Sequence, residues 1–402
     1  MYNMLKYKTV TLLLLITLNV IKNLFHKKRS NKKMKKMSSL FKRLLILVVV
    51  LCLGSGVCNT SFVCMQVNAA SNDPLKVHYF NVGDADAMII EKTTKNEKHY
   101  MLVDTGWNSR DKLNITYTQA THPVKLWMNA NNVEKFDYVV ITHYDRDHVA
   151  ALQFLLDDVE VDTFLARKYG PVVSERLENA KNKFDSQYYD NYQYFLSVVN
   201  NKKANLVFPT NEDKSLRFAE DVILSFKNNK ASYVTSDVMN NEKDYKEAVN
   251  NDSLVFHMKI DGTDAKYLFL GDLKKNGLTD YLDQINNKNK VTTQFSVLKV
   301  PHHCMFSNDT LPQSLQETFQ STIKSVISVT SRCVPETSNK NPMMQALDNI
   351  KNMQQYNTYD TYNKKGINNY CISTNGNSFH VYYETVTSNK VTSSEILKTI
   401  NK

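Results

Sequence analysis

The side chains most able to do chemistry are concentrated in one short segment. The sequence reads His143-Tyr144-Asp145-Arg146-Asp147-His148, so two imidazoles and two carboxylates occupy six residues. An apolar, β-branched run over residues 136–141 precedes them, which is typical of a buried strand, and strand ends deliver side chains into clefts. Mixed nitrogen and oxygen donors suit zinc, manganese or iron better than calcium or magnesium. We therefore expect this segment to bind a transition metal.

These groups could instead be structural. In that interpretation Asp145 and Asp147 are solvated turn residues, and His143 packs at the end of the strand. Four such groups held together without a cation would repel one another or stay unpaired, which disfavours the structural interpretation.

Two further segments place metal-binding residue types after apolar runs. Asp272 ends Phe269-Leu270-Gly271-Asp272, and Leu298-Lys299-Val300-Pro301 leads into His302 and His303. Either motif alone is weak evidence. The order of the three segments along the chain, with an apolar run before each, is far more specific.

In this order the segments resemble those of the metallo-β-lactamase superfamily, and within it the ComEC-like hydrolases, which are related to the soluble domain of the bacterial DNA-uptake channel. The similarity runs along most of residues 75–385, and segments 82–87, 102–106 and 250–255 also carry it. The resemblance implies an α/β (α+β) fold, a four-layer αββα sandwich of two mixed β-sheets flanked by helices. It also implies a metal-dependent hydrolase, because a bound metal lowers the pKa of water from 15.7 toward about 7.

The resemblance further implies how the metal-binding residues are shared between two positions. One metal would be held by Asp147, His148, Asp272 and one histidine of the His302/His303 pair. A second would be held more weakly by His143, Asp145 and Asp272. Asp147 and Asp272 are the expected catalytic residues. The expected cofactors are one or two divalent transition metals, zinc or manganese, with no organic cofactor.

Three assignments stay open at this point. Of the histidine pair we favour His302 as the ligand and His303 as its neighbour, although both could face the cleft across a turn. Asp86 and Asp104 could hold the free N–H groups of ligating imidazoles, or could only cap turns. His257 could stand in for the superfamily's middle histidine, but its place inside an expected strand predicts that it packs rather than binds metal.

The sequence departs from the superfamily pattern at two other places. Cys304-Met305 stands where Gly-Ser is usual, and Asn341-Pro342 stands where His-Pro is usual. Together with the missing middle histidine, the altered Cys304 keeps open a degenerate extracellular binding module, in which the fold survives and catalysis does not.

Short β-rich runs separated by turn residues are expected to build the sheets. The expected strands cover residues 75–80, 87–91, 99–103, 136–141, 161–165, 205–208, 222–226, 254–260, 266–270, 295–300 and 323–330, and a hairpin of 370–373 and 378–383 turns at Asn375-Gly376. Helices are expected in part of 111–132, over 150–156 and 343–353, and in an insertion around 174–203. Two β-rich halves with helices between them indicate two sheets flanked by helices.

The formal net charge of +10 comes from the N-terminus. Residues 1–69 hold twelve Lys or Arg and no Asp or Glu, which leaves 38 basic and 40 acidic residues, a net charge of −2, for the rest. The rest therefore lacks the basic excess typical of tight polyanion binding, although a local patch including Lys299, Arg332 and Lys340 could serve.

The N-terminal segment has the features of an export signal. A Lys-rich stretch over residues 32–43 precedes an apolar run over 44–53, and Val67-Asn68-Ala69 resembles a signal-peptidase site. We expect residues 1–33 to be an upstream extension or a gene-calling artefact, 34–69 a signal peptide, and 70–402 the hydrolase domain. Secretion is the expected location, with a retained N-terminal membrane anchor as the alternative.

Three cysteines follow the expected signal, Cys304, Cys333 and Cys371, without the short paired spacing of a zinc ribbon or a disulfide framework. A single bridge between Cys333 and Cys371 stays open in an oxidising location.

Two classes of substrate are compatible with the expected metal site. Hydrolysis of a phosphodiester in nucleic acid is the leading hypothesis, since the group that the sequence resembles is linked to DNA processing and two-metal sites favour in-line displacement at phosphorus. The alternative is a hydrolase of small esters, lactones or β-lactams. Asp145 in place of a histidine argues against a typical β-lactamase.

Overall fold

The computed structural model describes most of the chain after residue 73. The described residues are 74–95, 97–107, 118–168, 186–210, 215–228, 232–235, 238, 241–286, 293–331, 341–362, 367–387 and 389–401. The expected N-terminal extension and signal peptide therefore lie outside the described residues. So does residue range 174–185 of the expected insertion, whose later part forms helix α7 (Ser186–Lys202).

The first of two large sheets has the strand order β18-β17-β16-β1-β2-β3-β4-β5-β6, with β19 paired to β17. Strands β3 to β6 run parallel to their neighbours, while the pairs from β3 back to β18 are antiparallel, so the sheet is mixed. Its strands are β1 (Leu75–Phe80), β2 (Ala87–Thr94), β3 (Glu97–Thr105), β4 (Lys135–Ile141), β5 (Glu160–Ala166), β6 (Asn205–Val207), β16 (Ile367–Thr374), β17 (Ser378–Thr387), β18 (Lys390–Ser393) and β19 (Lys398–Asn401).

The second sheet has the order β15-β14-β12-β10-β9-β8-β7. It is also mixed, because β10, β12, β14 and β15 are parallel while β7 to β10 are antiparallel. Its strands are β7 (Leu216–Ala219), β8 (Val222–Phe226), β9 (Phe256–Ile260), β10 (Lys266–Phe269), β12 (Val297–Lys299), β14 (Ile327–Thr330) and β15 (Gln354–Asn357). A small separate ladder joins β11 (Thr293–Gln294) to β13 (Ile323–Lys324).

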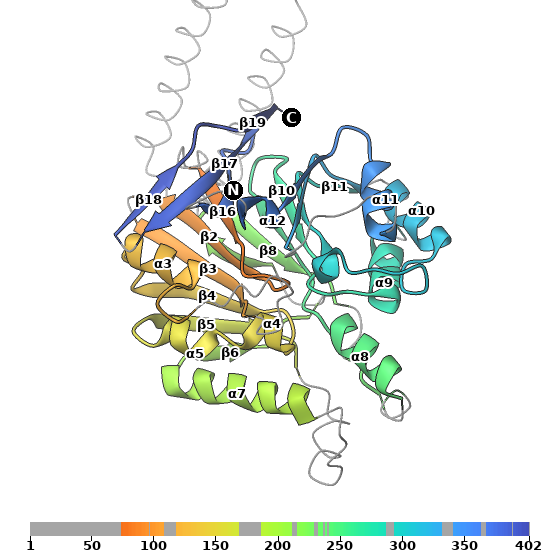
Figure 1. Cartoon of the computed structure of the whole chain (residues 1–402), viewed down its shortest axis with the longest axis horizontal. Helices are drawn as coiled ribbons and strands as arrows, with labels where there is room; N and C mark the ends of the chain where they lie inside the picture. The colour runs from red at the N-terminus through yellow and green to blue at the C-terminus, as the bar shows by residue number, and fades with distance from the viewer. Residues whose placement is uncertain are drawn as a thin grey trace, which may run out of the picture. The chain divides into compact units, whose positions relative to one another are not determined.

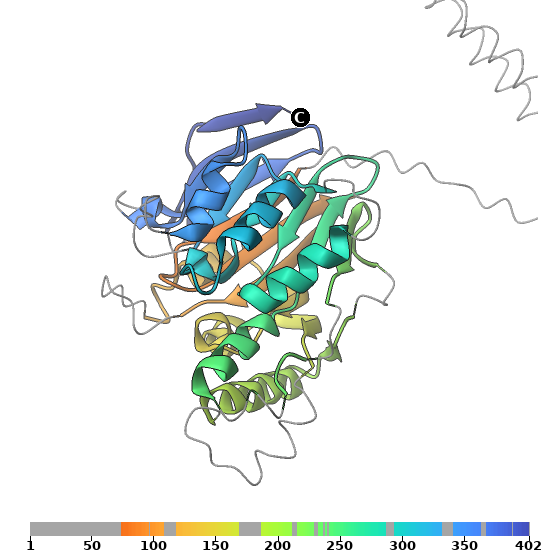
Figure 2. The same ribbon diagram turned by 90° about the vertical axis from the view of Figure 1, so that its right-hand side faces the viewer.

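Helices cover the outer face of each sheet, as Figures 1 and 2 show. The first sheet carries α7 together with α3 (Pro123–Ala130), α4 (Arg146–Val149) and α5 (Leu152–Leu156), and the second carries α9 (Lys275–Asn286), α10 (Gln313–Thr322) and α11 (Pro342–Asp348). Two further helices are α8 (Glu242–Asn251) and α12 (Tyr359–Tyr362). The expected four-layer αββα sandwich of two mixed sheets is confirmed.

Three apolar clusters hold these layers together. One lies between the first sheet and its helices and contains Trp127 and Phe195. A second lies between the two sheets and contains Val77 and Phe256, and a third lies between the second sheet and its helices and contains Phe319. Burial on both faces explains why the first half of the central strand β2, residues 87–90, is a continuous apolar run rather than an alternating one.

Several expectations about single residues can now be compared with the structure. His257 lies in β9, where its Nε2 is 2.8 Å from the Tyr281 hydroxyl, so it packs as expected. Cys371 is a buried free thiol, and its possible partner Cys333 lies outside the described residues. Among the described helices, none combines the length and hydrophobicity that crossing a membrane requires.

Candidate metal centre

Three loops at the ends of strands bring the expected ligands together. Strand β4 ends at Ile141, and the chain then enters α4, whose first turn carries Asp147 and His148. Strand β10 ends at Phe269, just before Asp272. Strand β12 leads into a single 3₁₀ turn, Pro301–Cys304, which carries the histidine pair.

Gly271 permits the close approach of two of these loops. Its φ of +53° lies in the left-handed region, where residues with a side chain are strained. A Cβ at this position would lie 2.6 Å from the Cβ of Ser253. With no Cβ there, the amide of Asp272 can donate to the Ser253 hydroxyl at 2.8 Å, which fixes the aspartate at the centre of the site.

Three side chains, those of His148, Asp272 and His303, form a tight group with ligand-like spacing, and Asp147 adjoins it through His303. The Nε2 atom of His148 is 3.2 Å from Nε2 of His303 and 3.3 Å from Oδ1 of Asp272. The Nε2 atom of His303 is 3.2 Å from Oδ2 of Asp272 and 3.3 Å from Oδ2 of Asp147. Ligands about 2.1 Å from a tetrahedral ion are separated by roughly 3.4 Å, so these atoms could surround one ion with little movement.

A second, looser group shares Asp272 with the first. The Nε2 atom of His143 is 3.5 Å from Oδ2 of Asp145 and 4.0 Å from Oδ2 of Asp272. Asp272 therefore lies between the two groups, where a carboxylate could bridge two cations. The wider spacing agrees with a second ion held more weakly.

Unpartnered polar atoms test whether a cation fits here. Nε2 of His143 and Oδ1 of Asp272 are buried and have no hydrogen-bond partner among the described residues. An unpaired buried polar atom costs about 1–3 kcal/mol, and more when it is charged. A divalent metal would satisfy both atoms, and mixed imidazole and carboxylate donors suit zinc or manganese, so the residues fit the expected cofactor.

The protonation equilibria of the group point the same way. Burial opposes the charged form of His148, but Asp272 and Asp104 raise its pKa well above the ordinary value. Burial likewise opposes ionisation of Asp272, yet His303 and His148 hold its pKa well below the ordinary value. The negative charges that favour protonated imidazoles would also favour a metal cation between them. Metal binding would then release the imidazole protons.

Asp104 supports His148 from behind. Its Oδ2 lies 2.8 Å from Nδ1 of His148, so the imidazole N–H donates to the carboxylate and the opposite nitrogen faces the group. Thr142 donates to the same carboxylate twice, from its amide at 2.8 Å and its hydroxyl at 2.7 Å. Asp104 itself has a φ of +53°. Asp104 therefore accepts a hydrogen bond from the His148 imidazole and also caps the turn at Thr142, so it has both of the roles that the sequence left open.

Asp86 stands in a similar relation to His303. Its Oδ1 lies 3.4 Å from Nδ1 of His303 and 2.9 Å from the ammonium of Lys299, and the Ser331 hydroxyl donates to it. Burial alone would raise the pKa of Asp86, but Lys299 and His303 hold it well below the ordinary value. The expectation that Lys299 belongs to a surface basic patch is wrong, because its side chain is only 2% exposed and pairs with Asp86. Arg332 and Lys340 lie outside the described residues.

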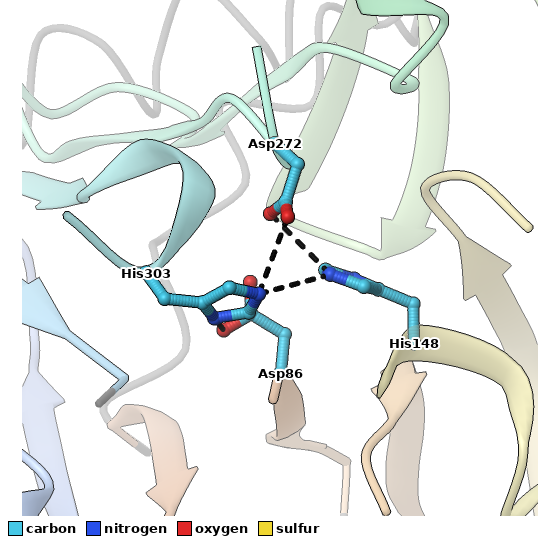
Figure 3. A group of neighbouring side chains, drawn as sticks. All are labelled: Asp86, His148, Asp272 and His303. Atoms are coloured by element: carbon cyan, nitrogen blue, oxygen red, sulfur yellow. Dashed lines mark hydrogen bonds and ion pairs between the residues drawn. The ribbon is translucent and has the colours of Figure 1, made fainter. Parts of the chain in front are cut away.

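Asp86 also lies close enough to the centre of the group to be a metal ligand itself. Figure 3 shows it beside His148, Asp272 and His303, and ligand atoms of all four lie within 4.8 Å of one another. Its Oδ2 is buried without a hydrogen-bond partner among the described residues. This oxygen could therefore contact an ion directly while Oδ1 holds His303.

Of the histidine pair, the structure places His303, rather than the favoured His302, in the tight group. Nδ1 of His302 is 2.8 Å from the carbonyl oxygen of Met305, and its ring does not join the tight group, whereas His303 does. His302, His303 and Cys304 all have a positive φ, between 48° and 62°. This left-handed turn directs the ring of His303 inward. The turn could not be predicted from the sequence pattern, which indicates only an extended strand before it.

Sequence reasoning missed four residues that position the site. The hydroxyls of Thr142 and Ser253 lie 3.2 and 3.4 Å from Nδ1 of His143. Thr142 also donates to the Asp104 carboxylate, and the Ser253 hydroxyl accepts from the backbone amide of Asp272. Ser331 links His303 to Asp86, and Lys299 neutralises Asp86. Only Ser253 and Lys299 lie in segments that the sequence singled out.

Comparison with known proteins bears on this geometry. Residues 81–221 match the metallo-beta-lactamase superfamily model. The matched region contains Asp86, Asp104 and the whole His143–His148 segment, while Asp272 and His303 follow it, after strands β10 and β12 of the second sheet. A search of curated proteins gave no match. The superfamily match and the cluster of metal-binding residues together indicate a metal-dependent hydrolase.

Proposed function

We propose that this protein is a secreted metal-dependent phosphodiesterase that acts on nucleic acid, within the ComEC-like branch of the superfamily. The observation that carries the proposal is the position of Asp272 between two groups of donors, 3.2 Å from His303 and 4.0 Å from His143. Two adjacent cations can stabilise both the attacking and the leaving oxygen of an in-line displacement at phosphorus.

The residues around the site would divide the work. A metal held by Asp147, His148, Asp272 and His303 would lower the pKa of water toward about 7 and stabilise negative charge on the substrate. Asp104 keeps the N–H of His148 turned away, so that its Nε2 lone pair faces the centre. These contacts orient the donors before substrate arrives, which is how a rigid site avoids reorganisation during the reaction.

Exposure indicates the side from which substrate enters. The side chains of Asp145 and Asp147 are 34% and 23% exposed, whereas those of His143, His148 and His303 are fully buried. Water and substrate would therefore approach past the two carboxylates. A phosphodiester would meet negative side chains there, so its binding would depend on the cations rather than on a basic surface.

The test is hydrolysis by the purified secreted form. Loaded with manganese or zinc, it should cleave labelled single- or double-stranded DNA, and both chelation and Asp272→Asn should abolish cleavage. Turnover of small esters or lactones without DNA cleavage would replace the proposed substrate with the acyl alternative. Less than about one bound metal per chain after reconstitution would favour a degenerate binding module.

Secretion needs its own measurement. Fractionation should find the protein outside the cell, with an N-terminus near Ala70. Protein retained in the membrane fraction with residues 34–69 attached would favour the anchor instead.

A further inference from the structure

A second cluster of metal-binding residue types lies on the outer face of the first sheet. It spans three neighbouring strands, with His78 on β1, Cys371 on β16 and Glu384 on β17. His78 and Cys371 are direct cross-strand partners, and Glu384 pairs with Asn369, two residues before Cys371. Helix α3 covers this face through Trp127, whose ring centroid is 4.5 Å from that of His78.

The three side chains are buried and close together. His78 is 1% exposed, Cys371 0% and Glu384 3%. One ligand atom from each lies within 4.8 Å of the other two, and Nδ1 of His78 is 2.7 Å from Oε2 of Glu384. Cys371 forms no disulfide and offers its sulfur. Imidazole, thiolate and carboxylate are all ligands that zinc binds in proteins.

The other nitrogen of His78 is placed as it would be in a metal ligand. Nε2 is 3.5 Å from Oε2 of Glu91 and has no hydrogen-bond partner among the described residues. Glu91 is held by Lys76 at 3.7 Å and Lys98 at 3.6 Å. A carboxylate behind the non-ligating nitrogen of an imidazole is the usual support for a metal-bound histidine, and Asp104 and Asp86 lie in the corresponding places behind His148 and His303, at the shorter distances of 2.8 and 3.4 Å.

Glu384 is also oriented, by Asn369. The Asn369 side-chain amide donates to Oε2 of Glu384, while Oδ1 of Asn369 is buried without a hydrogen-bond partner among the described residues. Burial raises the pKa of the Cys371 thiol, so without a cation the sulfur keeps its proton. Binding of a divalent ion would form a metal–sulfur bond and release that proton to solvent.

We propose that His78, Cys371 and Glu384 form a second, structural metal site, selective for zinc-like ions, that ties β1, β16 and β17 together beneath α3. The three side chains are at most 3% exposed, so substrate could not reach an ion there, which favours a structural rather than a catalytic site. The site is independent of the proposed hydrolase function, because it shares no residue with the centre around Asp272.

Cobalt substitution distinguishes this site from the first one. Within the described residues the centre around Asp272 has no cysteine ligand, so a near-ultraviolet thiolate-to-cobalt charge-transfer band should come from Cys371 alone. The full chain carrying Asp272→Ala should be loaded with Co²⁺ and its spectrum recorded. We expect the band to be present, to disappear in Cys371→Ser, and to persist in the matched control Cys304→Ser.

Metal stoichiometry provides the second readout. Cys371→Ser should reduce bound zinc by about one ion per chain without changing DNA cleavage by a chain with an intact Asp272. If Cys371→Ser does not fold, a chelator should still lower the melting temperature of the Asp272→Ala protein. Absence of the cobalt band, or a band that survives Cys371→Ser, would overturn the proposal and would leave the hydrolase function untouched.

Discussion

Replacing Asp104 by asparagine isolates the role of the carboxylate behind His148. Asparagine has almost the same shape, tolerates the φ of +53°, and can still accept the Thr142 amide through its side-chain oxygen. It removes the negative charge that lies 2.8 Å from Nδ1 of His148. The substitution therefore keeps the turn and changes the support of the imidazole.

The expected loss follows from the chemistry of supporting carboxylates. Removing such a partner weakens metal binding by about 10–100-fold, which corresponds to about 1.4–2.7 kcal/mol. Asp104→Ala should be worse for folding, because the Thr142 amide would be buried without an acceptor at a cost of about 1–3 kcal/mol. Alanine would also be strained by about 1–2 kcal/mol at a positive φ.

Competition against a chromophoric chelator measures metal affinity, and thermal unfolding of the metal-free proteins measures stability. The two variants should differ: Asp104→Asn should lose mainly metal affinity, whereas Asp104→Ala should lose both metal affinity and stability. If Asp104→Asn binds metal as tightly as the parent while Asp104→Ala only melts earlier, Asp104 is a turn cap and its proposed support of His148 is refuted.

Three other perturbations have definite expected outcomes. His303→Ala should lose tight metal binding and His302→Ala should keep it, as a metal titration of both would show, because only His303 joins the tight group. Lys299→Met should cost about 3–5 kcal/mol in denaturant unfolding by removing the ammonium that neutralises the buried Asp86 carboxylate, and adding Asp86→Asn should recover part of the loss. Burial lowers the pKa of His122 from 6.5 to about 3. Between pH 6.5 and 3 this imidazole is therefore protonated only in the unfolded chain, so the free energy of unfolding falls as the pH drops below 6.5. Chemical denaturation at pH 6.5 and 5 should show a loss of about 2 kcal/mol that His122→Phe lacks, and an equal loss in that variant would exclude His122 as the cause.

The central strands and the first ligand loop could be predicted because their signals are local. Strands β1 and β8 have the predicted bounds, since short β-rich runs bounded by turn residues mark strands in the sequence. The His143–His148 segment combines four metal-binding side chains within six residues, which no ordinary turn requires. Functional residues that are neighbours in the sequence can therefore be predicted without knowledge of the fold.

Features that depend on distant residues were missed or misassigned. Lys299 was assigned to the surface from its charge, but Asp86, more than two hundred residues earlier in the chain, holds it in the interior. The short edge strands β7, β15, β18 and β19 carry too few residues for a clear pattern. Helix α10 was not predicted, although Leu315 and Phe319, which pack against the second sheet, do have helical spacing.

The most direct test of the metal centre is the number of ions bound by three purified proteins after reconstitution with zinc or manganese. The parent should bind ions at both groups of the centre, His143→Ala should lose the weaker ion and keep the tight one, and Asp272→Ala should lose both, because Asp272 is shared. Parent-like metal content and hydrolysis in Asp272→Ala would contradict the account, since the residue at its centre would then hold no ion.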